Sequence, residues 1–337
     1  MPDDLARWAA KRAPELLARA EAQAVEELKR ALLDAALGRR DEERAPTAPR
    51  TAARPASPPA PRPTTPTGDG IWAYCVGRAG DALPEGLPGV HADGQVHRVE
   101  HEGLVALFSR VPLAEFGEEP LRRNLNDLEW LERVARTHEA VLERALQTAT
   151  IVPLRLCTIF EDEQGVRRML DDQRPAFTAA LELLAGRQEW GVKLLVDREA
   201  LEAAARARRT GEDSSAEELD SRSAGGAYLQ RRRLERQVRE EADRLAVGVA
   251  EEVHARLQDW VTDAVLNPPQ NRDLSGHEGE MLLNGAYLVE TPKVERLREL
   301  VGELEDRHRA LGVRLEMTGP WPPYNFVPRD PAAAALA

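Results

Sequence analysis

The chain has 337 residues, a formal net charge of −12 at pH 7, 42% hydrophobic residues and 4% aromatic residues. This length predicts two domains, with cores built mainly from Leu, Val and Ala. The acidic charge argues against general affinity for nucleic acid or anionic lipid, which both bind through excess Lys and Arg. No apolar run approaches the roughly 18 residues that span a bilayer, and charges interrupt the N-terminal stretch that a signal peptide would need. We therefore expect a cytoplasmic protein without a membrane span.

The N-terminal region predicts a helix followed by a linker. Residues 1–40 carry Leu and Ala at helical spacing, which indicates an amphipathic helix with a narrow apolar stripe. Residues 41–68 are rich in Pro, Ala and Thr and predict a semi-rigid disordered linker. We expect both segments to be separable from the folded body, and the helix to serve association, including self-association.

Residues 69–187 predict a first α+β domain. Apolar and β-branched runs indicate strands at 71–78, 96–103, 104–111 and 150–160. A tight turn at Glu102-Gly103 is expected between the second and third of these strands. Apolar residues at alternating spacings of three and four predict helices at 127–147 and 161–185.

Residues 188–319 predict a second α+β domain. Its expected strands are 189–197, 261–266, 281–290 and 313–319. Its expected helices are one after the first strand, broken by a polar loop, a long one after Gly226, and one at 292–311. The resulting order, βαββαβ, is the ferredoxin-like arrangement. Residues 320–337 remain as an aromatic and proline-rich C-terminal segment with a tail.

Few residues suggest catalysis or metal binding. The common phosphate, dinucleotide, nucleophile and zinc motifs are absent from the sequence. Two Glu-x-x-His pairs, Glu251 with His254 and Glu305 with His308, have the spacing of di-iron carboxylate bundles. Strands separate their two helices, and chance accounts for such pairs in a Glu-rich chain. We therefore predict no metal, no cofactor and no catalytic residue.

His138 and the two cysteines of the chain are best interpreted as core residues. Cys75 and Cys157 each lie in an apolar, strand-like run, which predicts reduced, buried thiols rather than a disulfide. His138 lies on the apolar stripe of its helix, and a nucleophile pair with Cys157 can be imagined. A histidine on an apolar face is more often a hydrogen-bonded core residue, so catalysis is not favoured.

Two arginine features have structural interpretations. Arg155 alternates with Leu154 and Leu156, and a structural ion pair is the default expectation for it, with partner binding as the alternative. The run 231–233 is interleaved with glutamates along its helix, which indicates a solvated helix face rather than a nucleic-acid patch.

The stretch MTGPWPPYNFV, residues 317–327, concentrates aromatic residues between prolines. Prolines exclude an ordinary helix or a central strand, so we expect a stiff, extended segment. It either folds back as a latch between domains or presents its rings to a partner, and the latch is favoured because the prolines lower its entropic cost. The candidate residues for either role are Trp321, Pro322, Tyr324, Phe326 and Arg155.

Four separated stretches of the sequence resemble the gas vesicle protein L/F family. They are THEAVLERALQTATIVPLRLCTIF, GGAYLQRRR, LNGAYLVE and GVRLEMTGPWPPYNFV. The final TGPWPPYNF is the most specific of these elements. One departure is Cys157-Thr158, where the family often has glycine before threonine, and it concerns the local packing of the predicted strand. The helix and linker of residues 1–68 lie outside the resemblance.

The resemblance implies an accessory protein of gas vesicle assembly, cytoplasmic or vesicle-associated, which contacts the small hydrophobic shell protein and other minor vesicle proteins. It implies no enzymatic activity. A chaperone-like or adaptor-like role is expected, because a soluble acidic partner could keep an edge-pairing subunit competent for assembly. The alternative is a minor structural component retained in the vesicle wall.

Overall fold

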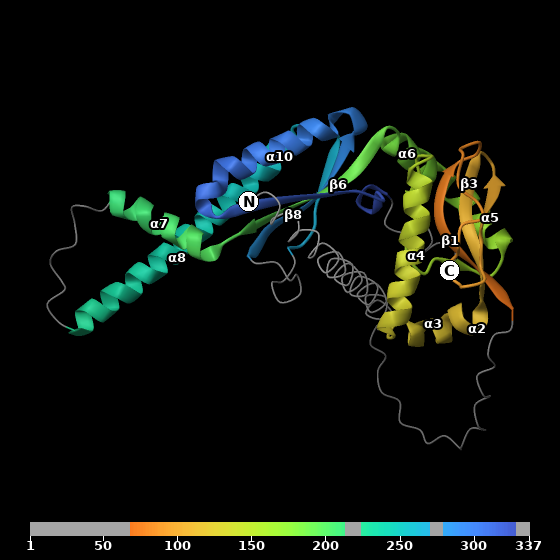
Figure 1. Ribbon diagram of the computed structural model, residues 1–337, viewed down its shortest axis with the longest axis horizontal. Helices are drawn as coiled ribbons and strands as arrows, with labels where there is room; N and C mark the ends of the chain where they lie inside the picture. The colour runs from red at the N-terminus through yellow and green to blue at the C-terminus, as the bar shows by residue number, and fades with distance from the viewer. Residues whose placement is uncertain (1–67, 213–223, 270–278, 328–337) are drawn as a thin grey trace, which may run out of the picture. The chain divides into compact units, whose positions relative to one another are not determined.

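The computed structural model of the chain describes residues 68–212, 224–269 and 279–327. These residues form two compact units, each with one antiparallel sheet and packed helices (Figure 1). The predicted α+β class is therefore confirmed. The helix and linker expected over 1–68 fall outside the described residues, apart from Gly68 itself. No described helix has the length and hydropathy that a membrane span requires.

The first sheet has the strand order β2-β3-β1-β4, and β5 also pairs with β1. Its strands are β1 (Asp69–Arg78), β2 (Val96–His101), β3 (Leu104–Pro112), β4 (Val152–Pro153) and β5 (Ile159–Phe160). The tight turn between β2 and β3 is confirmed, since Glu102 and Gly103 have φ angles of 48° and 83°. Left-handed conformations at both positions suit a two-residue hairpin turn.

Helices cover this sheet on both sides, with α4 on one side and α5 on the other (Figure 1). The helices of the first unit are α2 (Leu113–Phe116), α3 (Glu118–Asn124), α4 (Leu128–Leu146) and α5 (Glu163–Asp172). The Asp127 side chain accepts hydrogen bonds from the backbone N–H groups of Glu129 and Trp130 and so caps α4, which confirms the helix predicted at 127–147. Coverage on both faces explains why β1 is apolar and buried along nearly its whole length.

Two predicted elements of this region were wrong. The strand expected at 150–160 is two short strands, β4 and β5, separated by a turn in which the Thr158 N–H donates to the Arg155 carbonyl over 3.2 Å. The helix expected at 161–185 is divided into α5 and α6 (Arg174–Leu184). Pro175 explains this break, because proline has no N–H for the ladder of a continuing helix but fits its first turn.

Cys157 lies in that turn rather than in a strand, although both cysteines are free thiols as predicted. Its φ angle of 66° is in the left-handed region, which glycine adopts without steric cost. The glycine that the family resemblance implies before Thr158 would fit this left-handed position without steric cost.

We expect Cys157→Gly to be more stable than Cys157→Ala by about 1 kcal/mol, because both lose the sulfur but only glycine relieves the left-handed strain. Chemical unfolding of the two variants measures the difference. The matched control is Cys75, a buried residue inside β1, where alanine should be the more stable replacement. Equal stability of the two variants at 157 would contradict the strain.

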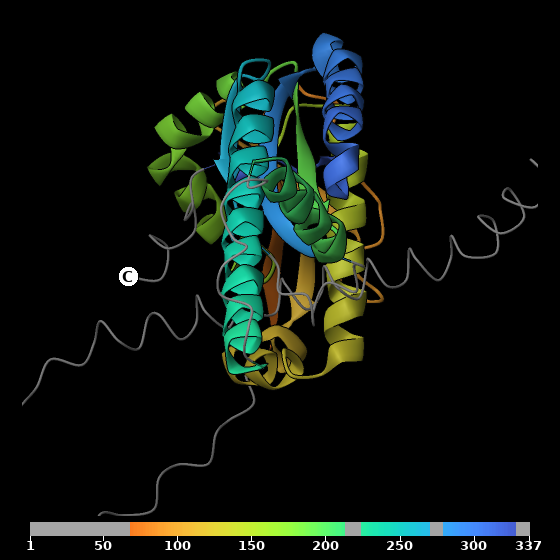
Figure 2. The same ribbon diagram turned by 90° about the vertical axis from the view of Figure 1, so that its left-hand side faces the viewer.

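The second sheet has the strand order β7-β8-β6-β9, with every neighbouring pair antiparallel. Its strands are β6 (Arg187–Val196), β7 (Asp263–Leu266), β8 (Glu280–Glu290) and β9 (Val313–Trp321). The helices of this unit beyond α6 are α7 (Arg198–Glu212), α8 (Ala224–Gln258) and α10 (Val294–His308). Figure 2 shows α8 and α10 side by side against the sheet.

One face of the second sheet packs its apolar side chains against these helices. Val192 and Leu194 of β6 and Val253 and Leu257 of α8 belong to this core, as the helical spacing predicts. Leu234, nearer the start of α8, is 51% exposed. The first turns of α8 extend away from the sheet together with α7 (Figure 1). No strand of the described sheet therefore covers the apolar side chains of these turns.

Candidate partner-binding site

The aromatic C-terminal segment begins where β9 ends. Trp321 is the last residue of β9, Pro322 and Pro323 follow, and a 3-10 turn spans Tyr324–Phe326. The two prolines stop the strand, because they cannot donate to a ladder and fix φ near −65°. The turn contacts β7. Since β7 and β9 are the two outer strands of the sheet, the segment reaches from one edge of the sheet to the other.

A buried carboxylate holds this segment in place. Glu189 of β6 accepts hydrogen bonds from the Asn325 backbone N–H over 3.1 Å and from the Asn325 Nδ2 over 2.6 Å. Trp190, the next residue, belongs to the core beneath the helices, so the alternation of a strand places Glu189 on the opposite face. The C-terminal segment therefore lies on the sheet face opposite to α8 and α10.

The environment of Glu189 favours its protonated form. Burial raises the pKa of this carboxyl from its usual 4.5 to about 7, and the two hydrogen bonds from Asn325 oppose that rise. The side chain is only 5% exposed, and no charged group among the described residues contributes to the shift of its pKa. Nothing in the sequence indicated Asn325, and the signal available for Glu189 was that it is the one acidic residue of β6.

The aromatic residues of the segment differ in exposure. Phe326 is buried, with 7% of its surface exposed, and Tyr324 is half-buried. Trp321 is 47% exposed, and its Nε1 donates to the Thr318 Oγ1 over 3.2 Å. The segment thus divides into a buried part, which anchors it to the sheet, and a partly exposed indole.

A glycine beneath the indole makes room for it. Gly191 pairs with Thr318 across β6 and β9. A Cβ atom at Gly191 would lie 3.0 Å from the Thr318 Oγ1 and 3.6 Å from the Trp321 Nε1. Any side chain at this position would therefore press on the hydroxyl that orients the indole.

The remaining candidate, Arg155, belongs to the first unit. It is exposed, in the turn that separates β4 and β5, and its guanidinium forms no ion pair with a residue that the structure describes. The structural ion pair expected for it is thus not found in that part of the chain. Its backbone carbonyl accepts the hydrogen bond from the Thr158 hydroxyl at 2.7 Å, so the backbone has the structural role.

His138 is a fully buried core residue in a satisfied polar network. The Trp72 Nε1 donates to its Nδ1 over 3.0 Å, so the proton is on Nε2, which donates to the Leu154 carbonyl over 3.2 Å. Tyr74 stacks on the imidazole and exchanges a 2.8 Å hydrogen bond with Ser109. Burial lowers the pKa of His138 to about 4, against the hydrogen bond to Leu154, which raises it. Both nitrogens are committed to these partners, which leaves none for a nucleophile.

One member of each Glu-x-x-His pair has a structural partner. Glu305 Oε2 accepts a 2.8 Å hydrogen bond from the Leu315 backbone N–H, and His254 Nδ1 lies 3.0 Å from the Tyr287 hydroxyl. Over 68–212, 224–269 and 279–327, no three His, Cys, Asp or Glu side chains are grouped so as to hold a metal ion. These residues connect helices to the sheet.

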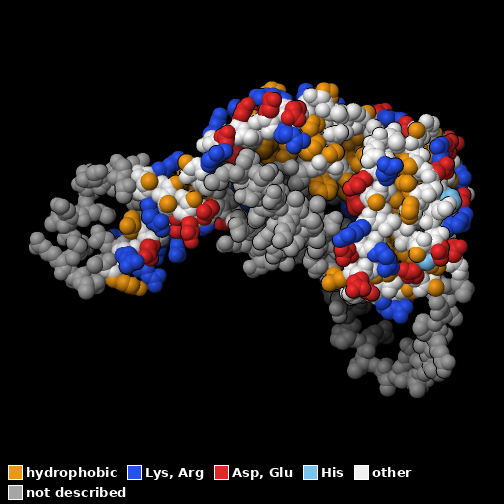
Figure 3. Space-filling view, in the orientation of Figure 1, with side chains coloured by type: hydrophobic (Ala, Val, Ile, Leu, Met, Phe, Trp, Pro, Cys, Tyr) orange, Lys and Arg blue, Asp and Glu red, His pale blue; other side chains and the backbone are white. Residues whose placement is uncertain are grey.

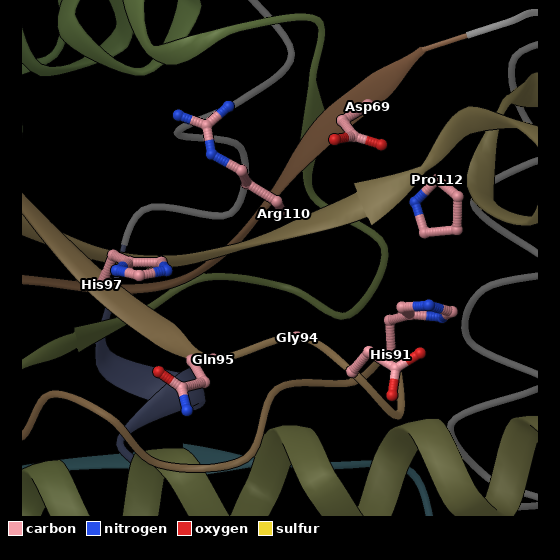
Figure 4. Close-up of a pocket in the computed structure, with 8 residues that line it drawn as sticks. Asp69, His91, Gly94, Gln95, His97, Arg110 and Pro112 are labelled. Carbon is pink, nitrogen blue, oxygen red and sulfur yellow. The ribbon is translucent and has the colours of Figure 1, made fainter.

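A polar depression on the first unit has a volume of about 350 Å³ and is lined by β1, β3 and the β2 region. Figure 4 shows Asp69, His91, His97 and Arg110 spread around it rather than converging on one point. Two of these side chains have ionic partners outside the set, since Arg110 pairs with Glu163 at 2.9 Å and the His91 Nδ1 lies 3.3 Å from Glu115. The depression therefore offers no assembled catalytic or ligand-binding group.

Comparison with known proteins identifies a single family. The model of the family described as "Gas vesicle synthesis protein GvpL/GvpF" matches residues 70–328. Gas vesicle protein L of Streptomyces sp. (strain CB03234) is 39% identical over 258 residues, which are 76% of this chain and 91% of the relative. Gas vesicle protein L1 of Halobacterium salinarum is 27% identical, over 77% of this chain and 91% of its own length.

A solved structure has the same fold. The crystal structure of the gas vesicle protein GvpF from Anabaena sp. PCC7120 superposes with a TM-score of 0.54 at 19% identity, covering 77% of this chain and 96% of that one. The fold, the family match over most of the described chain and the relatives of both L and F kinds agree with one another. The chain belongs to the gas vesicle synthesis protein GvpL/GvpF family.

Proposed function

We propose that this chain is a non-catalytic accessory protein of gas vesicle assembly that binds the small hydrophobic shell protein and other minor vesicle proteins as a chaperone or adaptor. The observation that supports contact with the shell protein is the exposure of Trp321. Its side chain is 47% exposed, on a segment that Phe326 and Asn325 anchor to the sheet. An oriented, exposed tryptophan suits an apolar partner, because such residues dominate the binding energy of protein interfaces.

Pro322, Tyr324 and Phe326 would act as the latch of this arrangement, on the face of their own sheet, and Arg155 would not take part. We also propose that the second unit is ferredoxin-like, a view supported by its βαββαβ order and its strand order β7-β8-β6-β9. The division at 187/188, the separability of 1–68 and self-association through the N-terminal helix stay proposals.

We expect Trp321→Ala to weaken shell-protein binding by about thirtyfold, the loss typical of an aromatic hot spot of about 2 kcal/mol, with little change in thermal unfolding. Pull-down with titrated shell protein and a melting curve measure the two effects. Leu128→Ala is the matched control, because Leu128 is 52% exposed but lies on α4 of the first unit. Binding that survives at full strength would remove Trp321 from the contact.

The alternative function is that of a minor component retained in the gas vesicle wall. It predicts that the protein stays in finished vesicles after assembly. Its amount per shell protein is to be compared in assembling cells and in finished, washed vesicles. An assembly factor should be depleted from washed vesicles, whereas a wall component should stay at constant ratio. Retention at constant ratio would overturn the proposal in favour of the structural role.

A further inference from the structure

The outer edge of β9 carries backbone groups that no strand of the described sheet pairs. The Asp197 N–H donates to the Gly312 carbonyl over 2.9 Å, which makes residues 197 and 312 a hydrogen-bonded pair just beyond β6 and β9. Because hydrogen-bonded and non-hydrogen-bonded pairs alternate along an antiparallel ladder, Val313, Leu315 and Met317 direct their N–H and C=O groups outward. An edge of this kind is a template for another strand.

A side chain of α10 occupies the centre of that edge. Glu305 is half-buried, and its Oε2 accepts the outward N–H of Leu315 over 2.8 Å. An incoming strand would have to displace this carboxylate and leave a negative charge beside its own backbone, which costs desolvation energy. The contact therefore both satisfies one donor and blocks the edge around it.

Side chains also form hydrogen bonds with outward backbone groups on two other edge strands, β2 and β7. On the first sheet, Arg167 Nη1 donates to the Glu100 carbonyl of β2 over 2.7 Å. On β7, the Ala264 N–H donates to the Asp263 Oδ1 over 2.8 Å. Charged side chains thus meet backbone groups at three strand edges, which is how folded proteins prevent edge-to-edge pairing.

We propose that Glu305 is an edge guard, and that without it a second copy of this chain pairs antiparallel along β9. The geometry favours the second copy as the occupant, because a two-fold pair centred on Leu315 lets each copy donate its Leu315 N–H to the Leu315 carbonyl of the other. Such a pair joins the two sheets edge to edge. Glu305 occupies the N–H at the centre of that pair.

The test is self-association of the full chain with Glu305→Ala. We expect its dimerisation constant, from sedimentation equilibrium, to rise about tenfold or more over the parent, together with slower amide exchange across β9. Glu305→Gln keeps an acceptor but loses the charge, so its dimerisation constant should lie below that of Glu305→Ala. Glu303→Ala is the control, since Glu303 is an exposed acidic residue of the same helix, paired with Arg296.

Two other results would contradict the proposal that Glu305 blocks pairing along β9. Folded Glu305→Ala with an unchanged dimerisation constant would contradict it, and so would stronger association without added protection in β9, because that association would use another surface. If alanine weakens the fold, Glu305→Leu keeps the apolar stem and still removes the acceptor. The same two readings then apply to that variant.

Discussion

Phe326→Ala is expected to lower the free energy of unfolding by about 3 to 5 kcal/mol, the usual cost of truncating a buried aromatic side chain. Phe326 is 7% exposed and closes the segment that Glu189 holds through Asn325. Without the phenyl ring, the 3-10 turn loses its apolar anchor on the sheet. Urea-induced unfolding followed by tryptophan fluorescence and by circular dichroism measures the loss.

The comparison with Trp321→Ala separates anchoring from contact. Trp321 is 47% exposed, so its truncation should cost far less stability than that of Phe326. If both variants unfold like the parent, the segment contributes nothing to the stability of the second unit. If Trp321→Ala is the more damaging of the two, the division into a buried anchor and an exposed indole is wrong.

Acidification from pH 7 to pH 4 is expected to remove about 3 kcal/mol of stability through His138 alone. Its pKa is about 4 in the folded protein because burial opposes the charged form, and its usual value is 6.5. Between these values the unfolded chain binds a proton that the folded chain rejects, so stability falls as pH falls through this window. His138→Gln should remove this loss, so that the stability of the variant falls less on acidification than that of the parent, although the substitution itself destabilises the network around Trp72 and Tyr74.

Glu189 acts in the opposite direction between pH 4.5 and pH 7. Burial raises its folded-state pKa to about 7, so the folded chain binds the proton that the unfolded chain releases, and stability rises as pH falls. The two contributions nearly cancel in the parent, and Glu189→Gln should steepen its acid sensitivity. Unfolding curves at pH 7.5 and pH 5 for the parent and both variants measure the slopes. Parallel slopes in all three proteins would contradict both shifts.

Local sequence patterns predicted the elements whose signals are local. Helix α4 follows from apolar spacing, and the hairpin between β2 and β3 follows from Glu102-Gly103. The strand expected at 150–160 failed because hydrophobic residues continue through a turn, and a cysteine in the left-handed region gives no turn signal in the sequence. The family-typical glycine before threonine was the one indication available there.

The candidate site was predicted only in part. The aromatic motif marked the segment that crosses the sheet, but composition cannot separate the exposed Trp321 from the buried Phe326, because that depends on which sheet face the chain crosses. Glu189 and Asn325 are 136 positions apart and meet only in the folded chain. Similarly, the spacing between Glu305 and His308 suggested a metal site, whereas Glu305 accepts a hydrogen bond from a backbone N–H of β9.

The proposed contact of Trp321 with the shell protein during gas vesicle assembly is tested most directly by site-specific photocrosslinking. A benzoylphenylalanine placed at position 321, and in parallel at position 128, is irradiated in assembling cells. Both positions carry exposed apolar side chains, on β9 and α4 respectively. We predict an adduct with the shell protein from position 321 and none from position 128. Absence of that adduct from position 321, or equal adducts from both positions, would contradict the claim.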